Sequence, residues 1–281
     1  MGRPRIDWTK EELDYAIQNF GLKSYREIGL DIGRTRIAVM VKMHKMGYKL
    51  EDKYNFDKRF FENIDNEEKA YWLGFIYADG YIYISKQANS SYCLGIELKY
   101  SDKNHLKKFN KSINGNIKIT DRDRKIKGYD NISRMSAIRI YSKQTIEDLL
   151  NLGISYRKSK KIIFPKLNTN LVRHFIRGYF DGDGSINIDK RSKQLRCAFC
   201  CGSKIFLEEM KNILDILEIK SYIGKTSPNS NCFSMGIVGK KSNKDFLEYI
   251  YNDSNIILDR KYDYYIANKE LLRYINKGWP Q

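Results

Sequence analysis

Two segments of this chain carry the same pattern about a hundred residues apart. They read Trp72-Leu73-Gly74-Phe75-Ile76-Tyr77-Ala78-Asp79-Gly80 and Ile176-Arg177-Gly178-Tyr179-Phe180-Asp181-Gly182-Asp183-Gly184. Each is an apolar stretch of helical type that ends in Asp-Gly, with small residues four positions apart. Residues with that spacing are neighbours on one helix face, so the two small faces can pack closely against each other. The small residues expected at this helix interface are Gly74, Ala78, Gly178 and Gly182.

The acids at the ends of the two segments are the first candidates for a functional site. Packing about a pseudo-twofold axis would bring Asp79 and Asp183 side by side at the same end of the helix pair. We expect the residues that follow them, Gly80 and Gly184, to adopt the left-handed conformation that often ends a helix. One apolar helix ending in Asp-Gly is a common capped core helix, but two copies at matched spacing favour a paired carboxylate site for a divalent metal.

The balance of charge points to a polyanionic partner. The 281 residues include 51 Lys and Arg against 34 Asp and Glu, a formal net charge of +17 that is spread along the chain. Nucleic acid is therefore the first candidate partner. No apolar run approaches the length of a membrane-spanning helix, and the N-terminus lacks a signal-peptide pattern, so we expect a soluble, intracellular protein.

The five cysteines are expected to be reduced thiols, because they are odd in number and scattered. Their nearest approach to a motif is Cys197-x-x-Cys200. The three histidines do not supply the second ligand pair that a zinc knuckle needs, so small strand residues are the favoured interpretation.

The stretch Phe175-Ile176-Arg177-Gly178-Tyr179-Phe180-Asp181-Gly182-Asp183-Gly184-Ser185-Ile186 strongly resembles the motif of the LAGLIDADG homing endonucleases, and the two motifs together resemble the single-chain, monomeric type. The resemblance implies an α+β fold in which an αββαββα half is used twice and the strands form a saddle over double-stranded DNA. It implies site-specific cleavage of both strands of a long target. Asp79 and Asp183 would be ligands of Mg²⁺, or of Mn²⁺ in its place, with Gly80 and Gly184 in the same metal-binding set.

The family pattern also places a basic residue from each half near the site. The aligned positions are Lys143 and Lys240, which follow Ile140-Tyr141-Ser142 and Ile237-Val238-Gly239. Each would orient or polarise the attacking water or stabilise charge in the transition state, although a lysine at a strand-to-helix junction is more often plain surface. Asp181 has Tyr77 as its counterpart, so we expect it to bond backbone near the lower helix end rather than to act in catalysis.

The chain divides into a small N-terminal part and a duplicated part. The predicted divisions are a helix-turn-helix-like DNA-binding module at 1–50, a linker at 51–67, the first half at 68–155, a basic linker at 156–170 and the second half with a C-terminal helix at 171–281. Each half reads as helix, two strands, helix, two strands and helix. The predicted elements are 68–79, 81–86, 92–100, 102–113, 116–122, 132–141 and 143–152, then 171–183, 185–190, 195–202, 203–217, 220–226, 232–238 and 240–252.

The first fifty residues show three short helical patterns, at 10–20, 24–32 and 35–46. Ser24 and Thr35 are the expected N-caps of the last two. The third pattern is basic and lacks acids, as expected of a helix that lies in a major groove, although a solvated helix of a small bundle is the alternative. Its expected DNA contacts are Arg34, Arg36, Lys42 and Lys45. Ahead of it, Gly2-Arg3-Pro4-Arg5 resembles the core of an AT-hook, and a disordered basic tail is an equal alternative.

Basic residues of the duplicated part fall where a saddle over DNA would need them. The expected DNA contacts are Lys86, Arg122, Arg124, Lys127, Arg157, Lys158, Lys160, Lys161 and Arg191. Strand side chains that could reach base edges are Tyr81, Tyr83, Ser85 and Lys86 in the first half and Asn187, Asp189 and Arg191 in the second. For any one of these residues, the alternative is that it merely faces water.

Two other functions share this fold and charge. A non-cleaving DNA-binding transcriptional regulator would keep the helix-turn-helix, but retention of both acids and both lysines argues against it. An RNA maturase acting on an intron stays open as an additional activity. An intein is not expected, because the sequence runs from Met1 to Trp279-Pro280-Gln281 without a splicing nucleophile or a terminal His-Asn.

Overall fold

The computed structural model describes residues 7–48, 54–85, 91–125, 132–154 and 162–272. The chain folds into two compact units, Met1–Asn55 and Phe56–Gln281. None of the described helices is long and apolar enough to cross a membrane. Several residues of the sequence analysis lie outside the described ranges: Lys86, Lys127, Arg157, Lys158, Lys160, Lys161 and the segment Gly2-Arg3-Pro4-Arg5.

The N-terminal unit contains three short helices, α1 (Lys10–Gln18), α2 (Tyr25–Asp31) and α3 (Arg36–Lys45), which follow the three predicted ranges closely. Side-chain caps start all three, because Thr9, Ser24 and Thr35 each accept a backbone N–H of the first turn. A small apolar cluster holds them together, formed by Ala16, Ile28, Val39 and Met43. The helix pair α2–α3 is joined by a tight turn, in which Gly33 has a φ of +66°.

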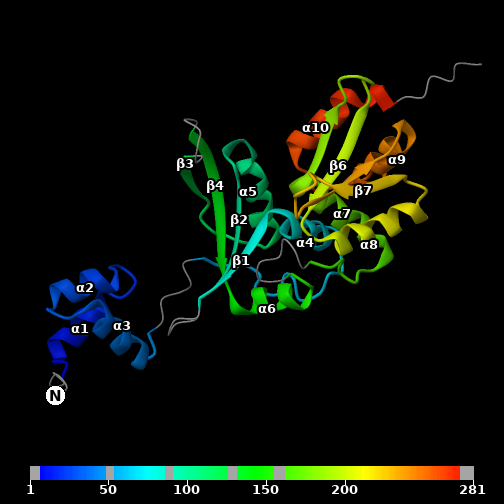
Figure 1. The fold of residues 1–281 in the computed structure, drawn as a ribbon. Coiled ribbons are helices and arrows are strands. Elements are labelled where there is room, and N and C mark those ends of the chain that lie inside the picture. Colours follow the sequence, from blue (N-terminus) through cyan, green and yellow to red (C-terminus); the bar gives the residue numbers. More distant parts are fainter. Residues whose placement is uncertain (1–6, 49–53, 86–90, 126–131, 155–161, 273–281) are drawn as a thin grey trace, which may run out of the picture. The chain divides into compact units, whose positions relative to one another are not determined.

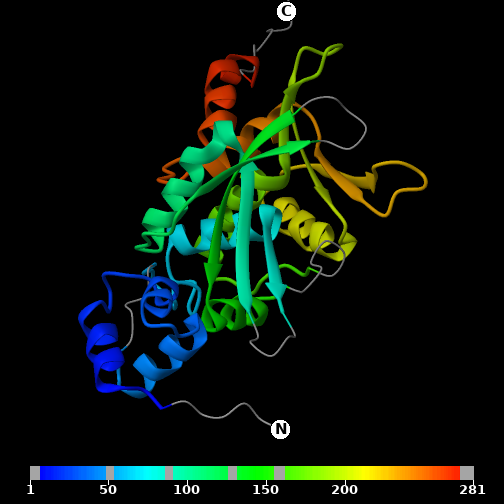
Figure 2. The same ribbon diagram turned by 90° about the vertical axis from the view of Figure 1, so that its left-hand side faces the viewer.

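The larger unit repeats one topology twice (Figures 1 and 2). The first half consists of α4 (Glu67–Asp79), β1 (Gly80–Ile84), β2 (Tyr92–Lys99), α5 (Lys103–Ser112), β3 (Thr120–Lys125), β4 (Ile132–Tyr141) and α6 (Lys143–Asn151). The second consists of α7 (Thr169–Asp183), β5 (Gly184–Ile188), β6 (Leu195–Cys201), α8 (Lys204–Ile216), β7 (Ser221–Lys225), β8 (Phe233–Ile237) and α9 (Lys240–Tyr251). The C-terminal α10 (Asp259–Asn268) and the short helix η3 (Lys269–Leu272) follow.

The two sheets have the same strand order and the same pairing. The first is ordered β1-β2-β4-β3 and the second β5-β6-β8-β7, and every pair is antiparallel. The register repeats as well, because Gly80 pairs with Ile96, and Gly184 pairs with Phe199. The predicted αββαββα half, used twice, is therefore confirmed.

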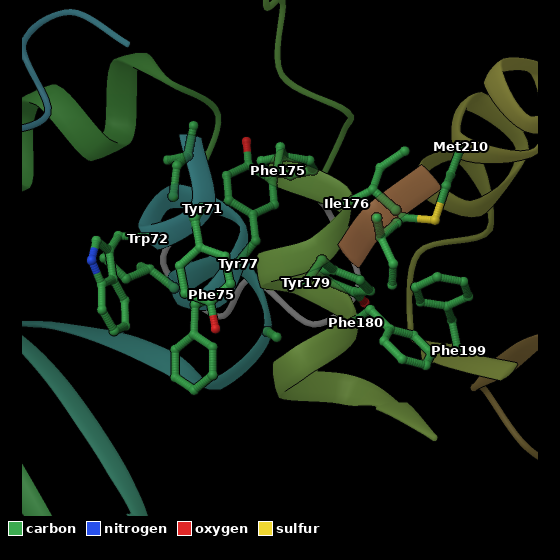
Figure 3. Packing of buried hydrophobic residues seen from close by; sticks show 14 of the residues in the cluster. Tyr71, Trp72, Phe75, Tyr77, Phe175, Ile176, Tyr179, Phe180, Phe199 and Met210 are labelled. Atoms are coloured by element: carbon green, nitrogen blue, oxygen red, sulfur yellow. The ribbon is translucent and has the colours of Figure 1, made fainter. Parts of the chain in front are cut away.

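The core of the unit runs through the helix pair α4 and α7, which lie side by side between the two sheets (Figure 1). Both helices are buried on nearly all sides, and their aromatic side chains fill the space towards each sheet (Figure 3). Tyr77 packs edge-on against Phe175 across the helix pair, with 5.1 Å between ring centroids. Phe180 packs in the same way against Phe199 of β6, at 5.4 Å.

Two local expectations were wrong. Strand β3 begins at Thr120 rather than at residue 116. The apolar residues that suggested an earlier start, Ile117 and Ile119, pack into the core before the strand, and the six residues of β3 are all exposed. Gly80 and Gly184 are extended, with φ of −73° and −75°, and not left-handed. Each turns directly into a strand, and a Cβ there would lie 2.7 Å or less from Ile76 or Phe180 of its own helix.

Candidate active site and nucleic-acid interface

The small residues of the two motifs meet at the helix contact. A Cβ on Gly74 would lie 2.0 Å from the carbonyl oxygen of Phe175, and one on Gly178 would lie 1.9 Å from that of Tyr71. Further along, the position of a Cβ on Gly182 is 2.3 Å from the Cβ of Ala78. The contacts advance together along both helices, so α4 and α7 run parallel and end at the same level. Only small residues allow two helices to approach so closely.

The parallel arrangement brings the two motif acids to the same place. Asp79 is the last residue of α4 and Asp183 the last of α7. An Oδ2 atom of Asp79 lies 3.3 Å from the position of a Cβ on Gly182, the neighbour of Asp183 in the chain. Asp183 is exposed and Asp79 is half-buried, so the paired carboxylates face outward between the first residues of β1 and β5.

A lysine that the sequence analysis did not single out lies beside these acids. Lys261 of α10 is buried, and its Nζ donates hydrogen bonds to the carbonyls of Phe180 (2.6 Å), Gly182 (3.1 Å) and Gly184 (2.5 Å). Burial lowers the pKa of Lys261 to about 8, although the negative charges of Asp181, Asp79 and Asp183 oppose the shift. The second motif helix therefore ends against an ammonium group.

Lys143 and Lys240, the lysines assigned from the alignment, do not lie there. Gly80 pairs with Ile96, which pairs with Ile138, and Lys143 follows Ile138 by five residues, beyond the end of β4. At about 3.3 Å per residue, the end of that strand is already about 10 Å from the level of the acids. Lys143 starts α6 and is ion-paired with Glu147 at 3.5 Å.

Lys240 occupies the equivalent place in the second half. It starts α9 and lines an open cleft with Asp215, Glu218 and Lys220. The alignment matched the two lysines to each other correctly, but the strand register carries both to the far end of their sheets. The register therefore places Lys143 and Lys240 away from Asp79 and Asp183, whereas Lys261 lies beside the end of α7.

Asp181 is fully buried and holds the C-terminal segment. Its carboxylate accepts hydrogen bonds from the hydroxyls of Tyr71 and Tyr251 and from the backbone N–H of Leu258, each at 2.7 Å. Burial raises the pKa of Asp181, while these donors and the charge of Lys261 favour its ionised form. The expectation of a backbone-bonding residue outside the symmetric pair agrees with these contacts.

The donor set at the helix ends consists of hard oxygen ligands, which suits magnesium. Asp79 and Asp183 supply two carboxylates, and no group of three His, Cys, Asp or Glu that could hold a metal occurs among the residues described. Magnesium commonly binds through one or two carboxylates plus water and phosphate oxygens, so two carboxylates fit it. The carbonyl of Gly184 is bonded to the Lys261 ammonium, which would repel a cation, and we therefore remove Gly184 from the metal-binding set. All five cysteines are free thiols, as expected.

Each sheet has one face covered by helices and one open face, because side chains alternate along a strand. The pattern of burial is identical in β1 and β5, so Tyr81 and Tyr83 in the first sheet, and Ser185 and Asn187 in the second, face outward. The ring of Tyr81 lies over Gly95 of the neighbouring strand, where a Cβ would meet it at 2.2 Å.

Arginines of β3 lie on the open face of the first sheet. Arg122 and Arg124 are more than half exposed and lie 2.5 Å and 3.8 Å from the carboxylate of Glu97. The register places further cations on the two open faces that the sequence analysis did not name: Lys99, Arg139 and Arg196. These three residues could have been found from the sequence, because side chains alternate between the two faces along β2, β4 and β6. Arg191 is exposed in the β5–β6 turn, whereas Asp189 closes that turn by accepting the N–H and hydroxyl of Ser192.

In the N-terminal unit, Arg34 has a different place from the one expected. Its guanidinium forms a two-point contact with Glu12 of α1, at 2.9 and 2.7 Å, and donates to the carbonyl of Asp7. Arg34 therefore joins α1 to the turn before α3, and these contacts leave its side chain only 13% exposed. Arg36 and Lys45 are exposed on α3, and Lys42 is half-buried.

A family model described as a LAGLIDADG-like domain matches residues 170–251. The matched residues run from α7 to the end of α9, so the second half of this chain is similar to a LAGLIDADG-like domain. The first half has the same topology, the same strand order and the same motif helix, so the LAGLIDADG architecture is present twice.

Solved LAGLIDADG structures have the same fold as the larger unit. The homing endonuclease I-WcaI bound to its DNA recognition sequence is 23% identical, with a TM-score of 0.54 that covers 79% of this chain and 96% of that chain. The structure of I-DmoI in complex with DNA and Ca is 22% identical, with a TM-score of 0.50 that covers 72% of this chain and 97% of that one. The similarity to these structures is a similarity of fold.

Curated relatives share shorter stretches with this chain. It is 32% identical over 132 residues to the replication factor C small subunit of Methanocaldococcus jannaschii, which covers 45% of this chain and 6% of that protein. It is 30% identical over 167 residues to the probable translation initiation factor IF-2 of the same organism, which covers 51% of this chain and 14% of that protein. The chain thus spans less than a sixth of the length of these relatives.

Proposed function

We propose that this chain is a site-specific endonuclease that hydrolyses one phosphodiester bond in each strand of a long double-stranded DNA target. The observation that carries the proposal is the pair Asp79 and Asp183 at the ends of two parallel helices, between two sheets whose open faces carry cations. Because both halves lie on one chain and differ in sequence, the protein would act as a monomer on an asymmetric target.

Asp79 and Asp183 are the residues that would hold magnesium, or manganese in its place. The bound ion would polarise a phosphate oxygen and favour ionisation of a water. The chain itself contributes the fixed position of both carboxylates, because the helices that carry them are buried and closely packed. Preorganised groups of this kind need no rearrangement when charge develops on the phosphate.

Lys261 is our candidate for the basic residue of the second centre. Its ammonium lies against the end of α7 and adds positive charge beside Asp183. In the sequence of the first half, Arg157 and Lys158 follow Asp79 by 78 and 79 residues, as Lys261 follows Asp183 by 78, but they lie outside the described residues.

The open faces of the sheets would bind DNA. Arg122, Arg124 and Arg191 are the proposed phosphate contacts of the described strands and turns, and Tyr81, Tyr83 and Asn187 are proposed to face the bases. The N-terminal unit would add contacts through α3, with Arg36 and Lys45 towards the phosphates. Such contacts make affinity fall steeply with salt.

The test is selection of cleaved sites from a randomised duplex library with magnesium. It is run with the unmutated protein, with Asp79→Asn and Asp183→Asn, and with Asp215→Asn as a control on the exposed part of α8. We expect one long asymmetric site, and each motif variant should lose double-strand cleavage by about a hundredfold or more while keeping its affinity for DNA.

A tight complex without any cleavage by the unmutated protein would contradict the nuclease. That result would favour a DNA-binding regulator, and preferential binding of structured RNA would favour a maturase. Equal loss of activity in Asp215→Asn would show that the effect is not specific to the motif acids.

A further inference from the structure

The first half holds the chain segment that carries the lysine of the second centre. Lys108 of α5 is ion-paired with Asp259 at 2.6 Å and donates to the carbonyl of Ile257 at 3.1 Å. Beside it, Arg260 lies 3.3 Å from the carboxylate of Asp102, which precedes α5. Contacts from one short stretch of the first half therefore reach residues 257, 259 and 260, directly before Lys261.

A second set of contacts starts at the beginning of α4. Glu67 accepts the backbone N–H and the side-chain amide of Asn255, both at 2.9 Å. The same carboxylate is bonded to the buried guanidinium of Arg177 at 2.6 Å, and Arg177 donates in turn to the carbonyl of Ile256 at 2.9 Å. Residues 255 and 256 are thus tied to both motif helices at once.

A buried chain of hydrogen bonds completes the connection. Tyr71 of α4 has a single hydroxyl proton, which it donates to Asp181, so His105 of α5 must donate its Nε2 proton to the oxygen of Tyr71 at 3.0 Å. In this tautomer the Nδ1 atom of His105 is an acceptor, and it has no partner among the described residues. Asp181 then accepts the N–H of Leu258, the residue that precedes α10.

We propose that the first half positions the lysine of the second cleavage centre. The elements are Glu67, the Asp102–Lys108 face of α5 and the Tyr71–Asp181 hydrogen bonds, and together they fix residues 255–260 and so place Lys261 at the end of α7. Its consequence for cleavage rests on the nuclease function proposed above, whereas the placement itself does not.

The geometry makes Lys261 sensitive to these anchors. It lies three residues after Leu258, within the first turn of α10, so any shift of the helix start moves it by the same amount. A displacement of about 1 Å at a reacting group can cost about a hundredfold in rate. The first half would in this way make the second centre competent only when the two halves are correctly packed.

The experiment breaks the connection at two places away from the acids. Tyr71→Phe keeps the ring and removes one donor to Asp181, and Lys108→Met removes the ion pair at a partly exposed position. Lys111→Met on the same helix is the matched control, and Lys108→Asp combined with Asp259→Lys restores the pair with reversed charges. Cleavage of each strand is followed separately with one or the other strand end-labelled.

We expect Tyr71→Phe to slow one strand about tenfold, and Lys108→Met about threefold, with the other strand and DNA affinity changed by less than about twofold. DNA nicked in one strand should therefore accumulate with both variants. The Lys108→Asp/Asp259→Lys protein should accumulate less of it than Lys108→Met. Equal slowing of both strands, or slowing that the reversed pair does not relieve, would overturn the proposal.

A second readout tests the placement without cleavage. Acetic anhydride modifies exposed amines, and mass spectrometry measures its rate at Lys261 in the full chain. Tyr71→Phe and Lys108→Met should raise this rate about threefold or more, and Lys111→Met should leave it unchanged. An unchanged rate at Lys261 in both variants would overturn the proposal even if the protein cleaves DNA. If the unmutated protein cleaves no DNA, the nuclease function fails while the labelling still decides the placement.

Discussion

The two motif helices share one contact surface but differ on their outer faces. Tyr77 and Asp181 occupy equivalent positions in α4 and α7. Tyr77 donates its hydroxyl to the carbonyl of Leu152 at 2.5 Å, whereas Asp181 accepts the N–H of Leu258 at 2.7 Å. Each bond holds the segment after the last helix of its half, α6 or α9. In the first half the motif helix donates the hydrogen bond, and in the second half it accepts one. The duplication has therefore kept the structural task and changed the residue that performs it.

A second pair of equivalent positions shows why the halves diverged. Leu73 is fully buried among apolar side chains, and Arg177 is equally buried but bonded to the carbonyls of Ile250 and Ile256. The carbonyls of Ile250, in α9, and Ile256, in the segment after it, both point to the buried guanidinium of Arg177, because buried carbonyls need donors. Leu73 has no such task, so the polar residue of the second half corresponds to the segment that packs against α7.

The largest expected effect is the loss of this arginine. Arg177→Met should lower the free energy of unfolding by about 3–5 kcal/mol, because Glu67 and two carbonyls lose a buried charged donor. Burial lowers the pKa of Arg177, but the nearby Glu67, Tyr71 and Asp181 support its charged form. Urea unfolding measures the effect, and Leu73→Met is the matched control, with an expected cost of less than about 1.5 kcal/mol. Similar costs at the two positions would remove the distinction between the outer faces.

The shared surface should respond equally in both helices. Gly74→Ala and Gly178→Ala each place a Cβ about 2 Å from a carbonyl oxygen of the other helix. Each should cost about 2–3 kcal/mol in the free energy of unfolding, measured by urea titration, since the helices must move apart. The control is Gly236→Ala, where nothing in the described part of the chain lies within 4 Å of the added Cβ. A large cost in one motif only would contradict the equivalence of the two faces.

The free energy of unfolding should depend on pH through His105, the residue of the first half that donates to Tyr71. Burial lowers the pKa of His105 to about 3, with the charges of Lys108 and Lys261 acting in the same direction. The unfolded chain takes up a proton near pH 6.5 and the folded chain does not, so this stability is present above pH 6.5 and is lost as pH falls towards 3. Between pH 7 and pH 5 the loss should be about 2 kcal/mol.

His105→Gln tests this prediction by urea unfolding at both pH values. The variant should be less stable than the unmutated protein at pH 7 and should lose about 2 kcal/mol less on acidification. His44→Gln, at an exposed position of the N-terminal unit, is the control for the substitution itself. An unchanged slope in His105→Gln would show that His105 is not held in its neutral form.

Local patterns predicted most of the elements. The alternation along β1 and β5, the side-chain caps at Ser24 and Thr35, and the small residues of the motifs are all local signals, and the elements they indicate are present. Strand β3 was misplaced because its residues, Thr120–Lys125, include no apolar side chain to set a period. Pairing with β4 defines it, and pairing depends on residues remote in sequence.

The candidate acids could be found from the motif repeat, because the residues that set their position, four apart on each helix, are close in the chain. Lys261 could not be found in this way, since its place beside α7 depends on contacts from Asp102, Lys108 and Asp181. The place of Arg34 could not be found from the sequence either, because its guanidinium is bonded to Glu12 of another helix. Neighbours along the chain establish helices, caps and repeats, whereas the partner of a long basic side chain is settled only when distant segments pack.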